Sequence, residues 1–105
     1  MTCGQVNIGD ISGGSTSLSV TGGLSSASKT IENGGKSVVT VNFPSQGGLD
    51  YVALISFQGM GTRDNDNDFE EPIIVTRSAT SIGVYLHETG SVTQNLRMHV
   101  MIMKY

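Results

Sequence analysis

The eleven residues at 95–105 constrain the fold of this chain more than any other segment. Large apolar side chains recur along it at a spacing of two, which is the period of a β-strand with one face in a core. The face expected to be buried carries Leu96, Met98, Val100 and Ile102. The opposite face also carries large side chains, which are Arg97, His99, Met101, Met103 and Tyr105. Because a small domain has a single core, an apolar second face predicts a further partner, and a second copy of the chain is the simplest one.

The composition favours strands over helices throughout the chain. Val and Ile together number 18, against 9 for Leu and Ala, and β-branched side chains fit strands better than helices. Gly, Ser and Thr supply 37 of the 105 residues, which is typical of a protein with many turns and polar outer strand faces. A chain of this length forms one domain, so we expect a single all-β domain over 1–105, with residues 1–4 as a frayed terminus.

Alternation of apolar and polar residues between glycine pairs and other turn signals locates the strands. The predicted strands are 5–8, 15–21, 28–31, 38–43, 51–57, 73–77, 82–87 and 95–105. Segment 51–57 is apolar on both faces, which predicts a central strand. No stretch has the 3.6-residue period and the caps of an α-helix. We therefore predict an antiparallel β-sandwich of about six to eight strands, with no helix longer than a turn or two.

Strand parity predicts which loops lie together. Successive antiparallel strands reverse direction, so their connections alternate between the two ends of the domain. The loops expected at the end away from the N-terminus are 9–14, 32–36, 58–72 and 89–94. Loops 58–72 and 89–94 are the two longest connections of the C-terminal half, and we expect them to form one recognition surface.

An acidic run in loop 58–72 holds five of the nine acidic residues of the chain. The candidate ligand contacts are Arg63, Asp64, Asp66, Asp68 and Glu70, with Thr93 and Gln94 from the neighbouring loop as neutral hydrogen-bonding groups. The alternation of Asp64, Asp66 and Asp68 also matches the start of a calcium loop, but the EF-hand pattern then requires Gly and Glu where this chain has Phe69 and Val75. Three interpretations remain open: ligand contact, an irregular calcium site at the three aspartates, and a solvated acidic loop. As surface changes, Asp66→Ala and Asp68→Ala are expected to leave stability nearly unchanged.

The predicted subunit contact uses the outward-facing groups that remain once the core is assigned. These are Tyr85, His99, Met101, Met103 and Tyr105. His87 and His99 lie on neighbouring predicted strands and are expected near each other. Neither has a second ligand at a recognisable spacing, so packing at the subunit contact is favoured over a metal pair or a pH switch.

Other classes of function are disfavoured by the sequence. The serines show no nucleophile elbow or base partner, and the only carboxylate cluster lies in a polar loop, so we do not expect an enzyme. The net charge is -3 and the six Lys and Arg residues are scattered singly, which disfavours nucleic acid and anionic lipid as partners. The absence of a secretion signal and of a long apolar segment predicts synthesis in a cytoplasm without membrane insertion. Cys3 is the only cysteine, which excludes an intrachain disulfide.

A family resemblance covers residues 36–105. These contain Val39-x-Val41-x-Phe43-Pro44, then Tyr51-Val52-Ala53-Leu54, a polar loop, Ser81-Ile82-Gly83-Val84-Tyr85 and the long final strand. This order resembles the C-terminal head domain of phage tail-fibre or tail-tip proteins, and it is also similar to the H-type lectin domain.

The resemblance implies a β-sandwich on a virion surface, made in the host cytoplasm, that assembles as a homotrimer. It also implies that distal loops bind a host-cell surface receptor, either a glycan or a protein. H-type lectins carry a Trp in the last strand, where this chain has Met101 and Met103, so no sugar-binding residue is carried over. The alternative is a structural knob for trimerisation or capsid decoration, with no ligand of its own.

Overall fold

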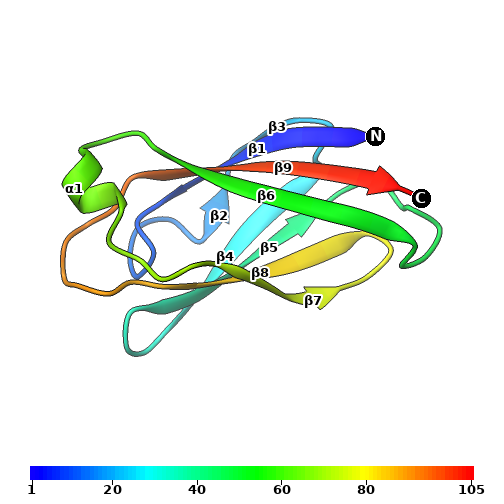
Figure 1. Ribbon diagram of the computed structural model, residues 1–105. Coiled ribbons are helices and arrows are strands. Elements are labelled where there is room, and N and C mark those ends of the chain that lie inside the picture. The colour runs from blue at the N-terminus through cyan, green and yellow to red at the C-terminus, as the bar shows by residue number, and fades with distance from the viewer.

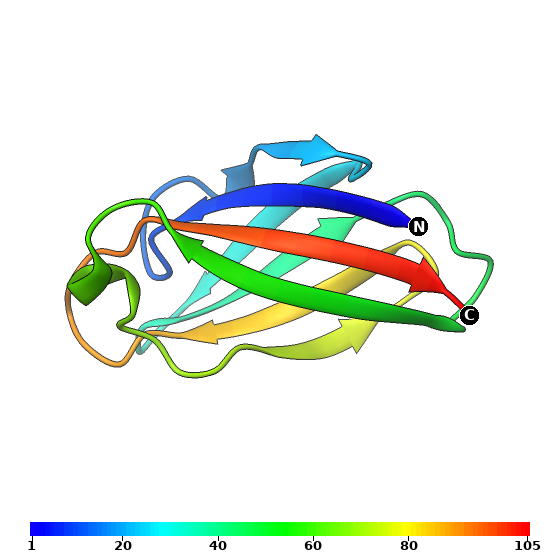
Figure 2. The ribbon, with the colours of Figure 1, turned by 45° about the horizontal axis from the view of Figure 1, so that its top comes forward.

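The computed structural model describes residues 1–105 as two antiparallel sheets packed face to face (Figures 1 and 2). Sheet A has the strand order β3-β1-β9-β6, and sheet B has the order β2-β4-β5-β8-β7. The strands are β1 (Thr2–Gly9), β2 (Ser17–Leu18), β3 (Val20–Gly22), β4 (Ser26–Glu32), β5 (Lys36–Asn42), β6 (Tyr51–Gly59), β7 (Ile73–Arg77), β8 (Ser81–His87) and β9 (Leu96–Lys104). The one helix, α1 (Arg63–Asp66), is a single turn. The predicted all-β antiparallel sandwich is confirmed. No helix is both long and apolar enough to cross a membrane.

The predicted strand 15–21 is divided between the two sheets. β2 pairs with β4 in sheet B, whereas β3 pairs with β1 in sheet A. The chain therefore passes from one sheet to the other at Ser19. Leu18 and Val20 pack against the core as the alternation predicts, but Thr16 is exposed. Alternation identifies the inward-facing side chains, but it contains no information about which sheet the backbone joins.

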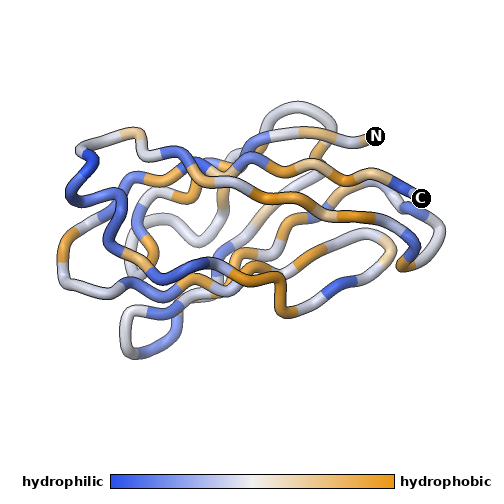
Figure 3. Tube along the Cα trace, in the orientation of Figure 1, coloured by the Kyte–Doolittle hydropathy of each residue, from blue (hydrophilic) through white to orange (hydrophobic).

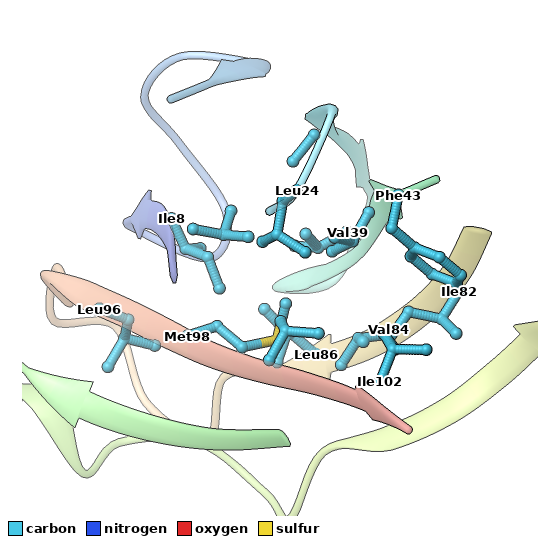
Figure 4. Packing of buried hydrophobic residues seen from close by; sticks show 14 of the residues in the cluster. Ile8, Leu24, Val39, Phe43, Ile82, Val84, Leu86, Leu96, Met98 and Ile102 are labelled. Carbon is cyan, nitrogen blue, oxygen red and sulfur yellow. The ribbon is translucent and has the colours of Figure 1, made fainter. Parts of the chain in front are cut away.

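The core lies between the inner faces of the two sheets. The predicted buried face of β9, which carries Leu96, Met98, Val100 and Ile102, is confirmed. Sheet B contributes Val39 and Val41 from β5, with Ile82, Val84 and Leu86 from β8 (Figure 4). Burying a side chain of this kind contributes about 1.5–3 kcal/mol relative to leaving it exposed. The alternating residues of β9 and β8 therefore hold the sandwich together.

β6 is an edge strand, so its prediction as a central strand is wrong. Only β9 pairs with it. Its inner side is well packed, since Tyr51 is completely buried and its hydroxyl donates a hydrogen bond of 2.7 Å to the carbonyl of Ser78. Its outer side is open, and Leu54 is 53% exposed. An apolar residue pattern on both faces predicted two buried faces, but sheet A has a second layer on only one side.

The N-terminus also differs from the prediction. Residues 2–4, which we expected to be frayed, belong to β1, and Thr2 pairs with Ile102. β1 lies between β3 and β9, so its backbone has a partner on each side. Gly4 is needed at this position, because a Cβ atom there would lie 2.3 Å from the carbonyl oxygen of Thr21. Residues 2–4 are therefore held by β9, and from Gly4 onward β1 is also held by β3.

Candidate functional site

The loops that parity assigned to one end of the domain do lie together there. The β1–β2, β4–β5, β6–β7 and β8–β9 connections are at the left in Figures 1 and 2, whereas both termini are at the right. Hydrogen bonds link these connections, including one of 2.8 Å from the amide of Met60 to the carbonyl of Asn95 and one of 2.9 Å from the amide of Glu88 to the carbonyl of Gly35. We call this part of the molecule the loop end.

Asp66 anchors the β6–β7 connection to the start of β9. It is only 7% exposed, although it lies in the acidic run. One carboxylate oxygen accepts a hydrogen bond of 2.7 Å from the amide of Gly61, and the other accepts one of 2.8 Å from the amide of Asn95. Asp66 is therefore not the surface residue that we expected, because it is buried and both of its carboxylate oxygens accept hydrogen bonds from the protein backbone.

Gln94 is the second internal anchor. Its side chain is buried, with 1% of the residue exposed. Its Oε1 accepts a hydrogen bond of 3.3 Å from the amide of Ile11, and its Nε2 donates to the carbonyls of Val92 and Asp68 at 2.9 and 3.3 Å. Gln94 thus connects three loops, and it is not the surface hydrogen-bonding group that we predicted.

Asp68 faces the same interior. Its carboxylate accepts a hydrogen bond of 2.9 Å from the hydroxyl of Thr89, and its backbone carbonyl accepts one of 3.1 Å from the amide of Thr89. The residue is half-buried. Asp68 therefore binds the β6–β7 connection to the β8–β9 connection, which makes a structural role the main one for this predicted contact.

Lys29, on β4 of sheet B, holds the β1–β2 connection in place. This lysine of β4 is 2% exposed, and its Nζ donates hydrogen bonds to the carbonyls of Ile8, Asp10 and Gly13. Burial lowers the pKa of its ammonium group, and the nearby carboxylate of Asp10 partly opposes that shift. Asp10 in turn accepts a hydrogen bond of 3.2 Å from the amide of Gln94. The buried groups of the loop end form one connected polar network.

Sequence reasoning missed Lys29, Asp10 and Asn95. A signal for Lys29 was present, since it lies two residues after Ala27, at a position that alternation in β4 places on the inner face. A lysine at an inward position requires several acceptors, because a buried ammonium group without partners is strongly disfavoured. Backbone carbonyls at the end of β1 and in the β1–β2 connection supply those acceptors here. No pattern of spacing in the sequence identifies them.

The remaining predicted contacts are on the surface of the loop end. Arg63, Asp64, Glu70 and Thr93 are exposed. Arg63 and Asp64 form an exposed ion pair of 3.3 Å, and Glu70 pairs with Nδ1 of His87 at the same distance. These side chains lie outside the buried network. Their exposed ion pairs contribute little to stability, so the side chains can reorient in solvent. They are the part of the predicted site that a ligand can reach.

The three aspartates do not converge on a metal position. Asp64 is exposed next to Arg63, whereas Asp66 and Asp68 point to different protein donors. The structure contains no group of three or more His, Cys, Asp or Glu side chains arranged to hold a metal ion. The alternation of the three aspartates along the chain therefore does not bring their carboxylates together on one face of the loop end.

The predicted subunit-contact residues are divided between opposite faces of the sandwich. His99, Met101 and Met103 lie on the outer face of sheet A, whereas Tyr85 lies on the outer face of sheet B. The expected proximity of His87 and His99 is wrong for the same reason, because β8 and β9 belong to different sheets. His99 instead lies 2.9 Å from Oε1 of Gln58 on the neighbouring strand.

The outer face of sheet A carries a shallow apolar hollow with a volume of about 490 Å³. Its lining includes Cys3 from β1, Leu54 from β6, and His99 and Met101 from β9. Met103, beyond the hollow on the same face, is 44% exposed. Figure 3 shows apolar stretches along both β6 and β9, in contrast with the hydrophilic α1 region of the loop end. The molecule thus has two distinct candidate surfaces, one polar and one apolar.

The comparisons with known proteins leave the site to be interpreted from its own geometry. No protein-family model matches the chain, and comparisons with curated proteins and with solved structures found no match. The two surfaces described above are therefore the basis for assigning a function.

Proposed function

We propose that this protein is a binding module, of the kind found at the heads of viral fibres, that attaches to a host-cell surface glycan through its loop end. The observation that carries the proposal is the buried polar network of Asp66, Gln94 and Lys29. Such a network fixes several loops in one arrangement and so provides a rigid support for exposed side chains. The loop end also faces away from both termini, which leaves it accessible when the domain is attached through either one.

The exposed groups of the loop end have the chemistry for a neutral polyhydroxylated ligand. Asp64 and Glu70 supply carboxylate acceptors, Arg63 supplies a fork of donors, and Thr93 supplies a hydroxyl that both donates and accepts. Adjacent sugar hydroxyls present donors and acceptors in pairs, which carboxylate and guanidinium groups can bind in a bidentate manner. A glycan therefore fits this surface better than an apolar ligand does.

The assignment to a viral fibre rests on the resemblance of residues 36–105 to phage tail-fibre heads. The β-sandwich and the position of the loops opposite the termini are consistent with that resemblance. On this proposal the protein is part of a virion surface. The homotrimer belongs to the same resemblance, and the apolar outer face of sheet A supports self-association more generally.

A pair of matched double variants tests the loop end. In Arg63→Ala with Asp64→Ala, one positive and one negative exposed group are removed from the loop end without a change in net charge. The control, Asp50→Ala with Lys104→Ala, makes the same change at the opposite end, where both residues are exposed. Attachment to host cells, and binding to an array of cell-surface glycans, should fall at least tenfold for the first variant only. Equal binding by both variants would refute the loop end as the recognition surface.

A structural role is the second candidate, and the outer face of sheet A is the observation that favours it. Leu54 and Met103 are exposed there, and exposed apolar groups that lie together mark contacts with other proteins. In that case the domain would join subunits without a ligand of its own. Substituting Leu54→Ser with Met103→Ser would then abolish assembly, whereas the loop-end variants would change nothing that can be measured.

A further inference from the structure

The four edge strands of the sandwich differ in how well they are protected against pairing with another chain. β2 has two residues, β3 has three, and β7 has five with an irregular register at Val75. β6 has nine residues and contains neither a charged residue nor a proline. Short length, bulges, charges and prolines are the features that keep natural sheet edges from pairing. β6 lacks all of them and is open to a further strand.

The pairing of β6 with β9 determines which of its backbone groups are free. The carbonyl of Asp50 accepts a hydrogen bond from the amide of Tyr105, and the amide of Met60 donates to the carbonyl of Asn95. Both pairs belong to the register in which even-numbered residues of β6 exchange hydrogen bonds with β9. The N–H and C=O groups of the odd-numbered residues consequently point toward the open side.

The open side is closed at one end only. Nη2 of Arg77, on β7, donates a hydrogen bond of 2.6 Å to the carbonyl of Tyr51. Beyond this contact, no bond on the open side is made by the backbone of Ala53, Ile55 or Phe57. Three successive donor and acceptor pairs are therefore available at the spacing of an extended strand, and only another extended polypeptide presents groups at the same spacing.

We propose that the open edge of β6 pairs with β6 of a second copy of this chain, antiparallel and about a two-fold axis at Ile55. In this register, Ala53 faces Phe57 of the partner subunit and Ile55 faces its own symmetry mate, so all three open residues exchange hydrogen bonds. The side chains are complementary as well, because small Ala53 is opposite large Phe57, and on the outer face Leu54 is opposite Ser56.

The charges around β6 favour the same arrangement. Arg77 and Lys104 lie at its start, where Arg77 is 4.3 Å from the ring of Tyr51 and Lys104 pairs with Tyr51 in the sheet. At its other end, Phe69 packs against Phe57 with ring centroids 5.6 Å apart and is followed by Glu70 and Glu71. An antiparallel pair places the basic start of each strand next to the acidic end of the other. No like charges oppose each other along β6 itself, because the strand has none.

The pair has consequences for the arrangement of the loop ends. A two-fold axis perpendicular to the sheet turns the two loop ends in opposite directions, so the assembly would present one at each pole. It differs from the homotrimer that the family resemblance implies, in which the heads point the same way. The pairing is independent of what the loop end binds, so it adds a bivalent geometry to the proposed function without depending on it.

Mass measurement combined with hydrogen exchange tests the pairing on the intact chain. The mass in solution should change from one chain to two as the concentration is raised. In the dimer the amides of Ala53, Ile55 and Phe57 should exchange at least tenfold more slowly than in the dilute monomer. The amides of Leu54 and Ser56, which bond to β9, should show no such dependence on concentration and are the internal control.

Two variants separate the edge from the rest of the fold. Ile55→Pro removes one outward donor and should abolish the dimer, with circular dichroism checking that the sheet signal is retained. Because a proline there can also disturb folding, Leu54→Lys provides a second route, since it places two positive charges near the two-fold axis. Thr21→Lys makes the same change on the edge strand β3 and should leave the dimer unchanged.

Each outcome distinguishes this inference from the loop-end proposal. A monomer at all concentrations, a trimer, or a dimer whose Ala53, Ile55 and Phe57 amides stay unprotected would overturn the edge pairing. A dimer that resists Leu54→Lys but not Thr21→Lys would also overturn it. Loss of glycan binding in the loop-end double variant, with the mass unchanged, would leave the edge pairing intact and concerns the loop end alone.

Discussion

The loop end buries several polar side chains, whereas the outer face of sheet A exposes apolar ones. The loop end is rich in charged and amide residues, yet Asp66, Gln94 and Lys29 are among the most buried polar side chains of the protein. On the outer face of sheet A, in contrast, the apolar side chains of Leu54 and Met103 are exposed. Polarity alone therefore identifies neither the interior nor the surface here. The hydrogen bonds that a polar side chain makes show whether it holds the loops together or is available to a ligand.

The sharpest test of this contrast compares two aspartates of the same short helix. Asp66→Ala removes the acceptor of two backbone amides and should lower the free energy of unfolding by about 3 kcal/mol, because buried donors left without partners are costly. Asp64→Ala, at an exposed position, should change it by less than about 0.5 kcal/mol. Urea denaturation measures both. Equal values for the two variants would mean that Asp66 does not anchor the loop. The large loss of stability now expected for Asp66→Ala replaces the expectation from the sequence that this substitution leaves stability nearly unchanged.

Gln94→Ala should have the next largest effect. It leaves the amide of Ile11 without its acceptor and opens a cavity between three loops, for a cost of about 2 kcal/mol. Thr93→Ala, on the exposed neighbouring residue, is the control and should be nearly neutral. Proteolysis of the folded protein should also become faster at the loop end in the Gln94 variant alone. Unchanged stability would show that the three loops are held by other contacts.

The buried ammonium group of Lys29 predicts a dependence of stability on pH. Its pKa in the folded protein is lowered, so in the alkaline range between that lowered value and the ordinary value of 10.5 the unfolded chain binds more protons than the folded one. The free energy of unfolding therefore gains a contribution from Lys29 that increases as the pH rises through that range. The slope is at most about 1.4 kcal/mol per pH unit.

Comparing the parent protein with a variant that lacks the titrating group isolates the contribution of Lys29 to the free energy of unfolding. Lys29→Met keeps a long side chain and lacks the titrating group, so the difference in stability between parent and variant should change across the alkaline range. Lys36→Met, at a half-buried position of β5, serves as the matched control. A difference that stays constant with pH would contradict the lowered pKa of Lys29.

The smallest effect is expected on the outer face of sheet A. Met103→Ser should change the stability of the isolated chain by less than about 0.5 kcal/mol, because Met103 is an exposed residue on the outer face. Met98→Ser, on the inner face of the same strand, should cost several times more, since Met98 is completely buried. Thermal unfolding at low concentration compares the two. Similar losses would mean that the outer face is buried in the unit that unfolds.

The parts of the fold that depend on local alternation were predictable from sequence. The inward residues of β9 and β8, the strand positions and the loops sharing one end all follow from period and parity. Sheet membership was not predictable in the same way. The split at Ser19 and the edge position of β6 depend on pairing between distant segments, and the same alternation is compatible with either sheet.

The candidate site was predictable in location but only partly in roles. Loops 58–72 and 89–94 do meet, because their positions follow from strand direction. Asp66 and Asp64 have the same side-chain chemistry and differ only in which way one helical turn directs them. The role of each residue depends on that direction, which no count of residue types contains.

The position of β9 has a consequence for how the chain acquires its structure during synthesis. β9 pairs with both β1 and β6, which are otherwise joined only to the short β3 or to nothing. Sheet B, in contrast, is complete once β8 has been made. On a ribosome, the uncharged β6 must therefore wait for residues 96–104 before it gains a hydrogen-bonded neighbour, and until then β1 has only the three-residue β3 beside it. An intermediate at that stage exposes the unpaired β6 and one open edge of β1, and slowing translation between β8 and β9 should lengthen the interval in which a chaperone is needed.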